Sequence, residues 1–304
     1  MRWQSKTVNP PPPTVRRRWR PSRSLLAAVL SLLAAVAWAQ SDAPLLKPGG
    51  QRVKIFVLTG QSNSLGTTAD KKVPDITPGT DPLDAQIPFL WANRSTRAGD
   101  GPAALYDDSG GKIVTLRAQK GTGADPLFWG PEIGFCRQLA AAGMKDFLFV
   151  KASRGGGGNS FWLKGSGNDH MYRHVVDTVR RAVQALPDGV TFEIAALLYV
   201  QGESDSAVEA AAAGERLRLL AANLRQDLPN AAAMRVIIGG IASGGKSSDL
   251  VRTQQSALPA ADPTFRYLDT LDLRSQRYDN LHFSKGAKLE LGRRMARAWL
   301  DWPQ

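Results

Sequence analysis

Two patterns of apolar and polar residues alternate along the chain from residue 53 onward. Short apolar runs have the length of buried strands, whereas longer stretches with an apolar residue every three or four positions are typical of amphipathic helices. Alternation of the two is typical of a parallel sheet that is covered by helices on both faces. Five parallel strands are predicted, at residues 55–58, 147–150, 194–200, 236–238 and 267–268.

Helices are predicted between and after these strands. Pro131 suits the first turn of one helix, and Pro187 ends the apolar stripe of another. The segment from Thr67 to Asp125 is rich in Gly, Pro and Asp without clear periodicity, which predicts long loops over one end of the sheet. A single α/β domain is therefore predicted over residues 40–304. Its helices are expected at residues 131–142, 171–186, 207–228 and 285–300.

The first 39 residues have a different composition. Five arginines within residues 16–23 precede an apolar run over residues 25–37, and the small residues Ala37 and Ala39 flank Trp38, as a signal peptidase requires. An N-terminal membrane anchor is the alternative, but the run is shorter than the roughly 20 residues of a spanning helix. Residues 1–39 are therefore predicted to be a secretory signal, and the mature protein is expected to be periplasmic or extracellular without stable membrane insertion.

The net charge of +12 suggests nucleic acid as a partner at first sight. Seven of the 39 basic residues, however, lie in the first 39 positions, where there is no Asp or Glu, and without them the excess is only +5. No cluster of Lys and Arg marks a phosphate-binding face, so a nucleic-acid partner is not expected. The single cysteine, Cys136, allows neither an intrachain disulfide nor a cysteine metal cluster, and it is expected to be a buried thiol.

Chemically competent residues follow several of the predicted strands. Ligands of parallel α/β sheets bind beyond the carboxyl ends of the strands. Ser62 lies in the sequence GQSN after the first strand, glycines occupy positions 155–158 after the second, and Gln201 opens the sequence QGESD after the third. Near the end of the chain, Asp279 precedes His282 by three residues.

Together these residues meet the needs of acyl transfer to a serine. Such a reaction needs a base for the hydroxyl proton, a group that orients this base, and donors for the oxyanion. Ser62 is predicted as the nucleophile, His282 as the base and Asp279 as its orienting carboxylate. The oxyanion donors are predicted to be the backbone amides of Ser62 and Gly156 and the side-chain amide of Gln201.

The sequence resembles the SGNH-type carbohydrate esterases, in particular carbohydrate esterase family 6 and the sialate O-acetylesterase-like (SASA) domain. The blocks GQSN, QGESD and DNLH carry this resemblance, together with the glycine run before Trp162. It implies a flavodoxin-like three-layer α/β/α sandwich and deacetylation of carbohydrates without a metal or organic cofactor. It also implies the same roles for Ser62, His282 and Asp279, and a glutamine donor at Gln201. The supporting residues within these blocks are expected to be Gln61, Asn63, Gly155 and Glu203.

Three other interpretations have less support in the sequence, and no metal site is expected. Residues 240–247 match the pattern of a phosphate-binding P-loop after a predicted strand, which would indicate a nucleotide hydrolase. His170 and His174 lie four residues apart and could share a metal, although no third ligand stands at a typical spacing. A carbohydrate-binding protein that has lost turnover is the third.

The prediction is thus an exported serine esterase that removes O-acetyl groups from acetylxylan or a similar acetylated sugar through an acyl-enzyme. A sialate O-acetylesterase is the alternative within the same chemistry. An acetylated carbohydrate is the expected partner, and no cofactor is expected.

Overall fold

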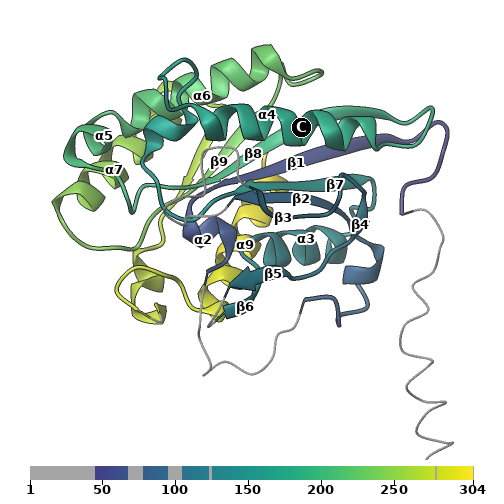
Figure 1. The fold of residues 1–304 in the computed structure, drawn as a ribbon, viewed down its shortest axis with the longest axis horizontal. Helices are drawn as coiled ribbons and strands as arrows, with labels where there is room; N and C mark the ends of the chain where they lie inside the picture. Colours follow the sequence, from purple (N-terminus) through teal and green to yellow (C-terminus); the bar gives the residue numbers. More distant parts are fainter. Residues whose placement is uncertain (1–44, 68–77, 95–104, 123–124, 278, 304) are drawn as a thin grey trace, which may run out of the picture. The chain divides into compact units, whose positions relative to one another are not determined.

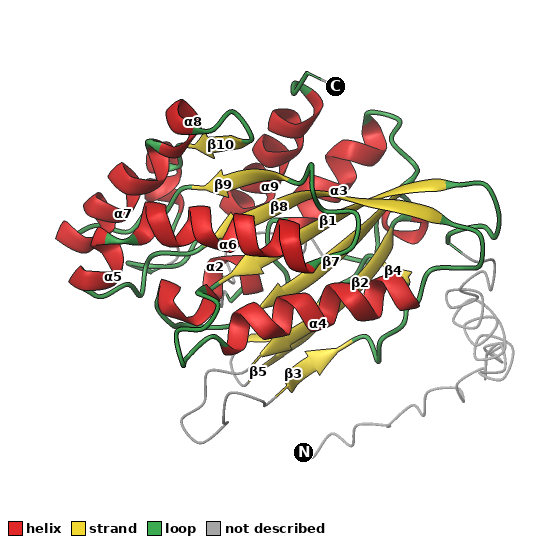
Figure 2. Ribbon diagram, turned by 90° about the horizontal axis from the view of Figure 1, so that it is seen from above, coloured by secondary structure: helices red, strands yellow, loops and turns green. Residues whose placement is uncertain are grey.

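An eight-stranded, mostly parallel sheet forms the centre of the structure (Figures 1 and 2). This computed structural model describes residues 45–67, 78–94, 105–122, 125–277 and 279–303. Six strands run parallel in the order β10-β9-β8-β1-β7-β2, and two short strands, β3 and β4, pair antiparallel with β2. The parallel strands are β1 (Arg52–Gly60), β2 (Pro88–Arg94), β7 (Phe147–Ser153), β8 (Thr191–Val200), β9 (Arg235–Gly239) and β10 (Phe265–Leu268). The remaining strands are β3 (Leu105–Asp108), β4 (Val114–Thr115) and the separate hairpin of β5 (Gln119–Thr122) and β6 (Asp125–Phe128).

Helices cover both faces of the sheet (Figure 2). One face packs on α4 (His170–Gln184) and α6 (Ala213–Asp227), and the other packs on α3 (Glu132–Ala141) and α9 (Lys285–Leu300). Side chains alternate between the two faces along each strand. Seven further helices or turns complete this set among the described residues: α2 (Ser62–Leu65), α5 (Ala207–Ala211), α7 (Lys246–Ser256), α8 (Leu258–Ala261) and the 3-10 turns η2 (Asp84–Gln86), η3 (Asn159–Trp162) and η4 (Leu271–Gln276).

Strand β1 illustrates how the core is divided. Ile55 and Val57 contribute to the core under α4 and α6, whereas Phe56 and Leu58 contribute to the core under α3 and α9. All four side chains are at most 1% exposed. A strand that is buried on both faces carries a continuous apolar run, which is the pattern in the sequence.

The five predicted strands are confirmed as β1, β7, β8, β9 and β10, and the α/β fold class is confirmed with them. The prediction of loops over residues 67–125 is wrong in part, because β2 adds a sixth parallel strand beside β7 and recruits β3 and β4. The helix predicted over 207–228 is interrupted at Ala212, which separates α5 from α6. The other three predicted helices are confirmed within two residues at each end.

The residues from Pro44 to Gln304 form one compact unit. The predicted signal at residues 1–39 lies outside the described residues. Among the residues that are described, none of the helices is both long and apolar enough to span a membrane.

Candidate active site

Strands β1, β7 and β8 end together at one edge of the sheet. Gly60 at the end of β1 is in register with Ser153 on β7 and with Val200 on β8. The chain segments that follow these three strands are the GQSN block, the glycine run and the QGESD block. Parallel pairing therefore brings three of the four predicted blocks to the same edge, as expected for a ligand site of an α/β sheet.

A tight turn between β1 and α2 presents Ser62. Gly60 has φ 143°, and a Cβ atom there would lie 1.9 Å from the carbonyl oxygen of Val200, so only glycine fits. The next residue, Gln61, donates its backbone N–H to the same carbonyl (3.0 Å). The side-chain oxygen of Gln61 accepts from the backbone amides of Gly202 (3.3 Å) and Ser204 (3.2 Å). This turn, residues 60–65, is called the Ser62 turn, and these hydrogen bonds connect it to the QGESD block.

Ser62, His282 and Asp279 form a relay, an unbroken chain of hydrogen bonds. The Oγ atom of Ser62 lies 2.9 Å from Nε2 of His282, and Nδ1 of His282 lies 2.7 Å from Oδ2 of Asp279. Oδ1 of Asp279 accepts from the backbone amides of Leu281 (2.7 Å) and His282 (2.5 Å). A carboxylate at Nδ1 selects the tautomer that carries its proton there, which leaves Nε2 to accept the hydroxyl proton of Ser62.

The same contacts keep Asp279 charged. Partial burial alone would raise the pKa of Asp279, but hydrogen bonds from the His282 ring and from the backbone amides of His282 and Leu281 outweigh burial and hold this pKa below its ordinary value. The carboxylate is therefore available to stabilise an imidazolium at neutral pH.

Asn63 connects the Ser62 turn with the loop that carries His282, residues 279–283. Its Oδ1 atom accepts from the backbone amide of Phe283 (2.9 Å), and its Nδ2 atom lies 3.3 Å from the carbonyl oxygen of Leu281. These two residues flank His282, and Asn63 itself follows Ser62. Asn63 therefore fixes Ser62 and His282 relative to each other.

Glu203 also contacts the side chain of Asn63. Its Oε1 atom accepts from Nδ2 of Asn63 at 2.5 Å, and its Oε2 atom is buried without a hydrogen-bond partner among the described residues. Burial raises the pKa of Glu203 to about 7, although the hydrogen bonds from Asn63 and from its own backbone amide favour the charged form.

This raised pKa predicts how stability depends on pH. Relative to Glu203→Gln, the free energy of unfolding of the wild type is expected to fall from about pH 4.5 to about pH 7, because the folded carboxyl still binds a proton that the unfolded one has released. Above pH 7 both carboxyls are ionised, so the difference becomes constant. Urea unfolding of both proteins at several pH values measures it. Glu215→Gln on the surface of α6, where an arginine lowers the pKa of the carboxyl, should show no such decline. A flat difference for Glu203→Gln would contradict the prediction.

Gln201 and the glycine run lie side by side. Gln201 is 1% exposed, and its Nε2 atom lies 3.4 Å from the carbonyl oxygen of Gly157. Nε2 also donates to Oδ1 of Asp205 at 2.5 Å, and Oε1 accepts from the hydroxyl of Tyr199 at 3.0 Å. Within the run, Gly156 has φ 60° in the left-handed region, whereas Gly155 does not. The structure thus brings every predicted site residue to one edge of the sheet, and their catalytic roles stay predictions.

A buried lysine, which the sequence analysis missed, contacts the Ser62 turn. Nζ of Lys151 donates to the carbonyl oxygen of Leu65 (2.8 Å), to Oε1 of Gln119 (2.7 Å) and to Oε1 of Glu132 (2.8 Å). Lys151 and Glu132 are fully buried, and burial lowers the pKa of Lys151 although Glu132 opposes this. A lysine directly after the apolar run 147–150 was the available signal, because lysine is almost never buried without a partner.

The P-loop match at 240–247 forms a different kind of turn. A phosphate loop turns its backbone N–H groups toward the ligand. Here the carbonyl oxygens of Ile241 and Ser243 accept hydrogen bonds from Arg252 (3.2 and 2.7 Å). These contacts fasten the loop to α7, which is a structural role.

The two histidines of α4 are buried and contact neighbouring strands and loops. His174 is 2% exposed and contacts the carbonyl oxygen of Ala92 through Nε2 at 2.8 Å, while Nε2 of His170 contacts Arg154 at 2.5 Å. Burial, together with nearby arginines, lowers the pKa of both histidines to about 4. Within the described part of the chain, no group of three potential metal ligands occurs. Cys136 is buried, as expected.

Comparisons with known proteins agree with this picture. A probable carbohydrate esterase of Arabidopsis thaliana is 35% identical over 154 residues, which make up 50% of this chain and 55% of that protein. The chain therefore matches only about half the length of this curated relative. The crystal structure of the Arabidopsis protein At4g34215 is similar with a TM-score of 0.58 and 25% identity, covering 81% of this chain and 97% of that one.

Two more solved structures share the fold. NanS has a TM-score of 0.54 at 16% identity, covering 84% of this chain and 98% of that one. A carbohydrate acetylesterase from Xanthomonas citri has a TM-score of 0.53 at 16% identity, covering 81% of this chain and 55% of that one. The family model described as carbohydrate esterase, sialic acid-specific acetylesterase matches residues 52–301, which is most of the chain. This chain therefore belongs to the SASA family of carbohydrate esterases.

Proposed function

We propose that this protein is a serine esterase that removes O-acetyl groups from a carbohydrate. The observation that carries this proposal is the hydrogen-bonded chain of Ser62, His282 and Asp279, with its two contacts of 2.9 and 2.7 Å, in a member of a carbohydrate esterase family. This arrangement supplies a nucleophile, a base within reach of its proton and a carboxylate that orients the base.

In the proposed reaction, Oγ of Ser62 attacks the acetyl carbonyl carbon while Nε2 of His282 accepts the hydroxyl proton. The tetrahedral intermediate collapses as His282 returns this proton to the departing sugar oxygen, which leaves Ser62 acetylated. Water then attacks the acetyl carbon and gives a proton to His282, and acetate leaves as His282 returns this proton to Oγ of Ser62. Asp279 stabilises the imidazolium in both halves of the cycle.

The oxyanion is proposed to be held by the backbone amides of Ser62 and Gly156 and by the side-chain amide of Gln201. Three features support this set. The amide of Ser62 is the first in α2, so no carbonyl of that helix accepts from it. The left-handed backbone at Gly156 lets the glycine run turn back toward the sheet edge. Nε2 of Gln201 donates one proton to Asp205 at 2.5 Å, whereas its second proton makes only a long hydrogen bond of 3.4 Å to the carbonyl oxygen of Gly157, which an oxyanion could replace.

Acetylxylan or a similar acetylated sugar is the proposed substrate, and O-acetylated sialic acid is the alternative that the family description names. We also propose export, which the basic and apolar first 39 residues with their small-residue cleavage site support. A polysaccharide outside the cytoplasm then becomes the natural target.

Acetate release from an aryl acetate, from acetylated xylan and from O-acetylated sialic acid tests the proposal. Release from the aryl acetate and from one of the carbohydrates is expected with wild-type protein and not with Ser62→Ala. Turnover of the aryl acetate alone would retain the esterase but contradict both proposed sugars. If a folded wild type releases no acetate from any of the three, the esterase proposal itself is wrong, and a binding protein becomes the better interpretation.

A further inference from the structure

Asp205 is a buried carboxylate that the proposed reaction does not use. It is 7% exposed, and it contacts Gln201, the proposed oxyanion donor. Its Oδ1 atom accepts from Nε2 of Gln201 (2.5 Å) and from the backbone amide of Asn159 (2.9 Å), and its Oδ2 atom accepts from Nδ2 of Asn159 (2.8 Å). Three N–H donors therefore surround this carboxylate.

The contacts of Gln201 determine which way its amide group faces. The Asp205 carboxylate accepts hydrogen bonds only, so it selects the NH2 end of the amide. At the other end, Oε1 accepts from the hydroxyl of Tyr199 at 3.0 Å. The second proton of Nε2 consequently faces the glycine run, where it is donated to the carbonyl oxygen of Gly157 at 3.4 Å, the longest of the three hydrogen bonds of this amide. If the amide were turned by 180°, its oxygen would face the glycine run and would repel an oxyanion.

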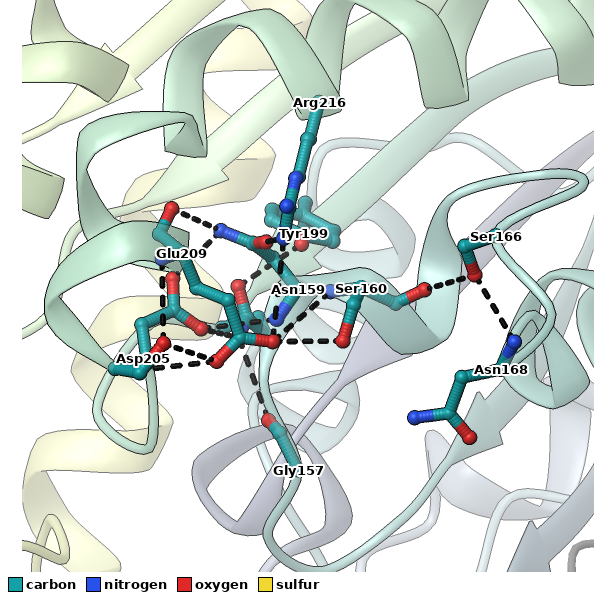
Figure 3. Close-up of polar contacts among 11 residues, drawn as sticks. Gly157, Asn159, Ser160, Ser166, Asn168, Tyr199, Asp205, Glu209 and Arg216 are labelled. Atoms are coloured by element: carbon teal, nitrogen blue, oxygen red, sulfur yellow. Dashed lines mark hydrogen bonds and ion pairs between the residues drawn. The ribbon is translucent and has the colours of Figure 1, made fainter.

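Asp205 is itself held in place by a polar network of η3, α5 and α6 (Figure 3). Oδ1 of Asn159 accepts from Arg216 (2.6 Å), and Nδ2 of Asn159 also donates to the carbonyl oxygen of Glu209 (2.8 Å). The carboxylate of Glu209 in turn accepts from the hydroxyl of Ser160 (2.7 Å). Arg216 thus contacts Asn159, which in turn donates to Asp205.

Holding an ionised carboxylate at this place is costly. Burial raises the pKa of Asp205 to about 6, and the nearby charge of Glu209 acts in the same direction, although the hydrogen bonds from Gln201 and Asn159 favour the charged form. A buried carboxylate that only filled space would be replaced without loss by a neutral side chain of similar size. Its direct contact with the proposed oxyanion donor indicates a use for the charge.

We propose that Asp205 is a positioning residue that holds the side-chain amide of Gln201 with one N–H directed at the developing oxyanion. This inference rests on the proposed function. It assigns the last residue of the QGESD block to orientation of a donor, just as Asp279 orients the base. Preorganised donors stabilise the transition state without any reorganisation during the reaction, so a misaligned donor lowers kcat more than it changes KM.

A double-mutant cycle on aryl acetate hydrolysis tests the inference. Gln201→Ala is expected to lower kcat by about 10²-fold, the effect of losing one oxyanion donor. Asp205→Asn is expected to lower kcat by about 10-fold to 100-fold with KM changed less than about 3-fold, because an amide cannot accept from three donors. In the double variant, kcat should equal that of Gln201→Ala alone, since there is no longer an amide to orient.

Arg218→Gln is the matched control. It removes an exposed ion pair with Glu215 on the same helix, α6, and is expected to leave kcat within about 3-fold of wild type, because Arg218 contacts neither Asp205 nor Asn159. Asp205→Ser, which leaves room for a water molecule, is measured in the same cycle so that a folding defect of Asp205→Asn does not leave the question open.

Two results would overturn the inference, and they differ in what they say about the function. If the losses in kcat of Asp205→Asn and Gln201→Ala multiply in the double variant, Asp205 acts independently of the amide, and the proposed function stands without this assignment. If Gln201→Ala alone keeps the wild-type kcat, Gln201 is no oxyanion donor, and that part of the proposed function is wrong as well.

Discussion

Replacing Ser62 with alanine is expected to lower kcat for acetate release by at least about 10⁴-fold, because no other group can form the acyl-enzyme and only oxyanion stabilisation and binding remain. Steady-state rates on an aryl acetate measure the effect. A fluorophosphonate should also label wild-type Ser62, and mass spectrometry of the labelled peptide should find no adduct on the alanine variant.

Ser64→Ala is the matched control for this experiment. Ser64 lies on the same helix and is fully buried, but its hydroxyl contacts Ser153 and the backbone of Gln61 instead of His282. Its kcat should stay within about 5-fold of wild type, since a buried hydroxyl outside the relay affects stability more than chemistry. If Ser62→Ala retains a tenth or more of the wild-type rate, the nucleophile assignment is wrong.

Replacing Asp279 with asparagine is expected to lower kcat by about 10⁴-fold, since the amide no longer favours the histidine tautomer that leaves Nε2 free to accept. The amide would also have to present its single oxygen to the backbone amides of Leu281 and His282 or to the His282 ring, but not to both. The profile of kcat/KM against pH adds a second test. Because the pKa of Asp279 is held low, protonation of Asp279 should contribute nothing to a fall of wild-type activity toward mildly acid pH.

Asp272→Asn separates this effect from a general loss of negative charge near the loop. Asp272 belongs to η4 and pairs with Arg294 on α9 without touching the relay. Its variant should keep kcat within about 3-fold, because exposed ion pairs contribute little. An Asp279→Asn variant that stays within 10-fold of wild type would show that the carboxylate is dispensable.

Local sequence patterns predicted most of the sheet but not β2. The missed strand contains the run Phe89 to Ala92, which is long enough for a buried strand. Pro88 before it and a polar, glycine-containing sequence after it favoured a loop. This run forms a strand because it pairs with β7, and no local sequence pattern contains that pairing. The break at Ala212 likewise has no local signal, since alanine by itself favours a continuous helix.

The site residues divide in the same way. Ser62, His282 and Asp279 could be predicted because their chemistry limits which residue types serve, and because each follows a recognisable run or block. The contacts of Asn63 could not, because its partners Leu281 and Phe283 lie 218 and 220 positions away and contribute only backbone atoms. A backbone donor or acceptor carries no signature in the sequence.

The separation of 220 positions between Ser62 and His282 also bears on how activity appears during folding. Closing a loop of that length has a larger entropic cost than forming contacts within one βα unit, so we expect the two residues to meet late in folding. Secondary structure can therefore recover in a refolding chain before the relay exists. Titration of the reactive serine would count only those molecules in which the last segment of the chain has docked onto the first strand, which makes the active site a reporter of completed folding.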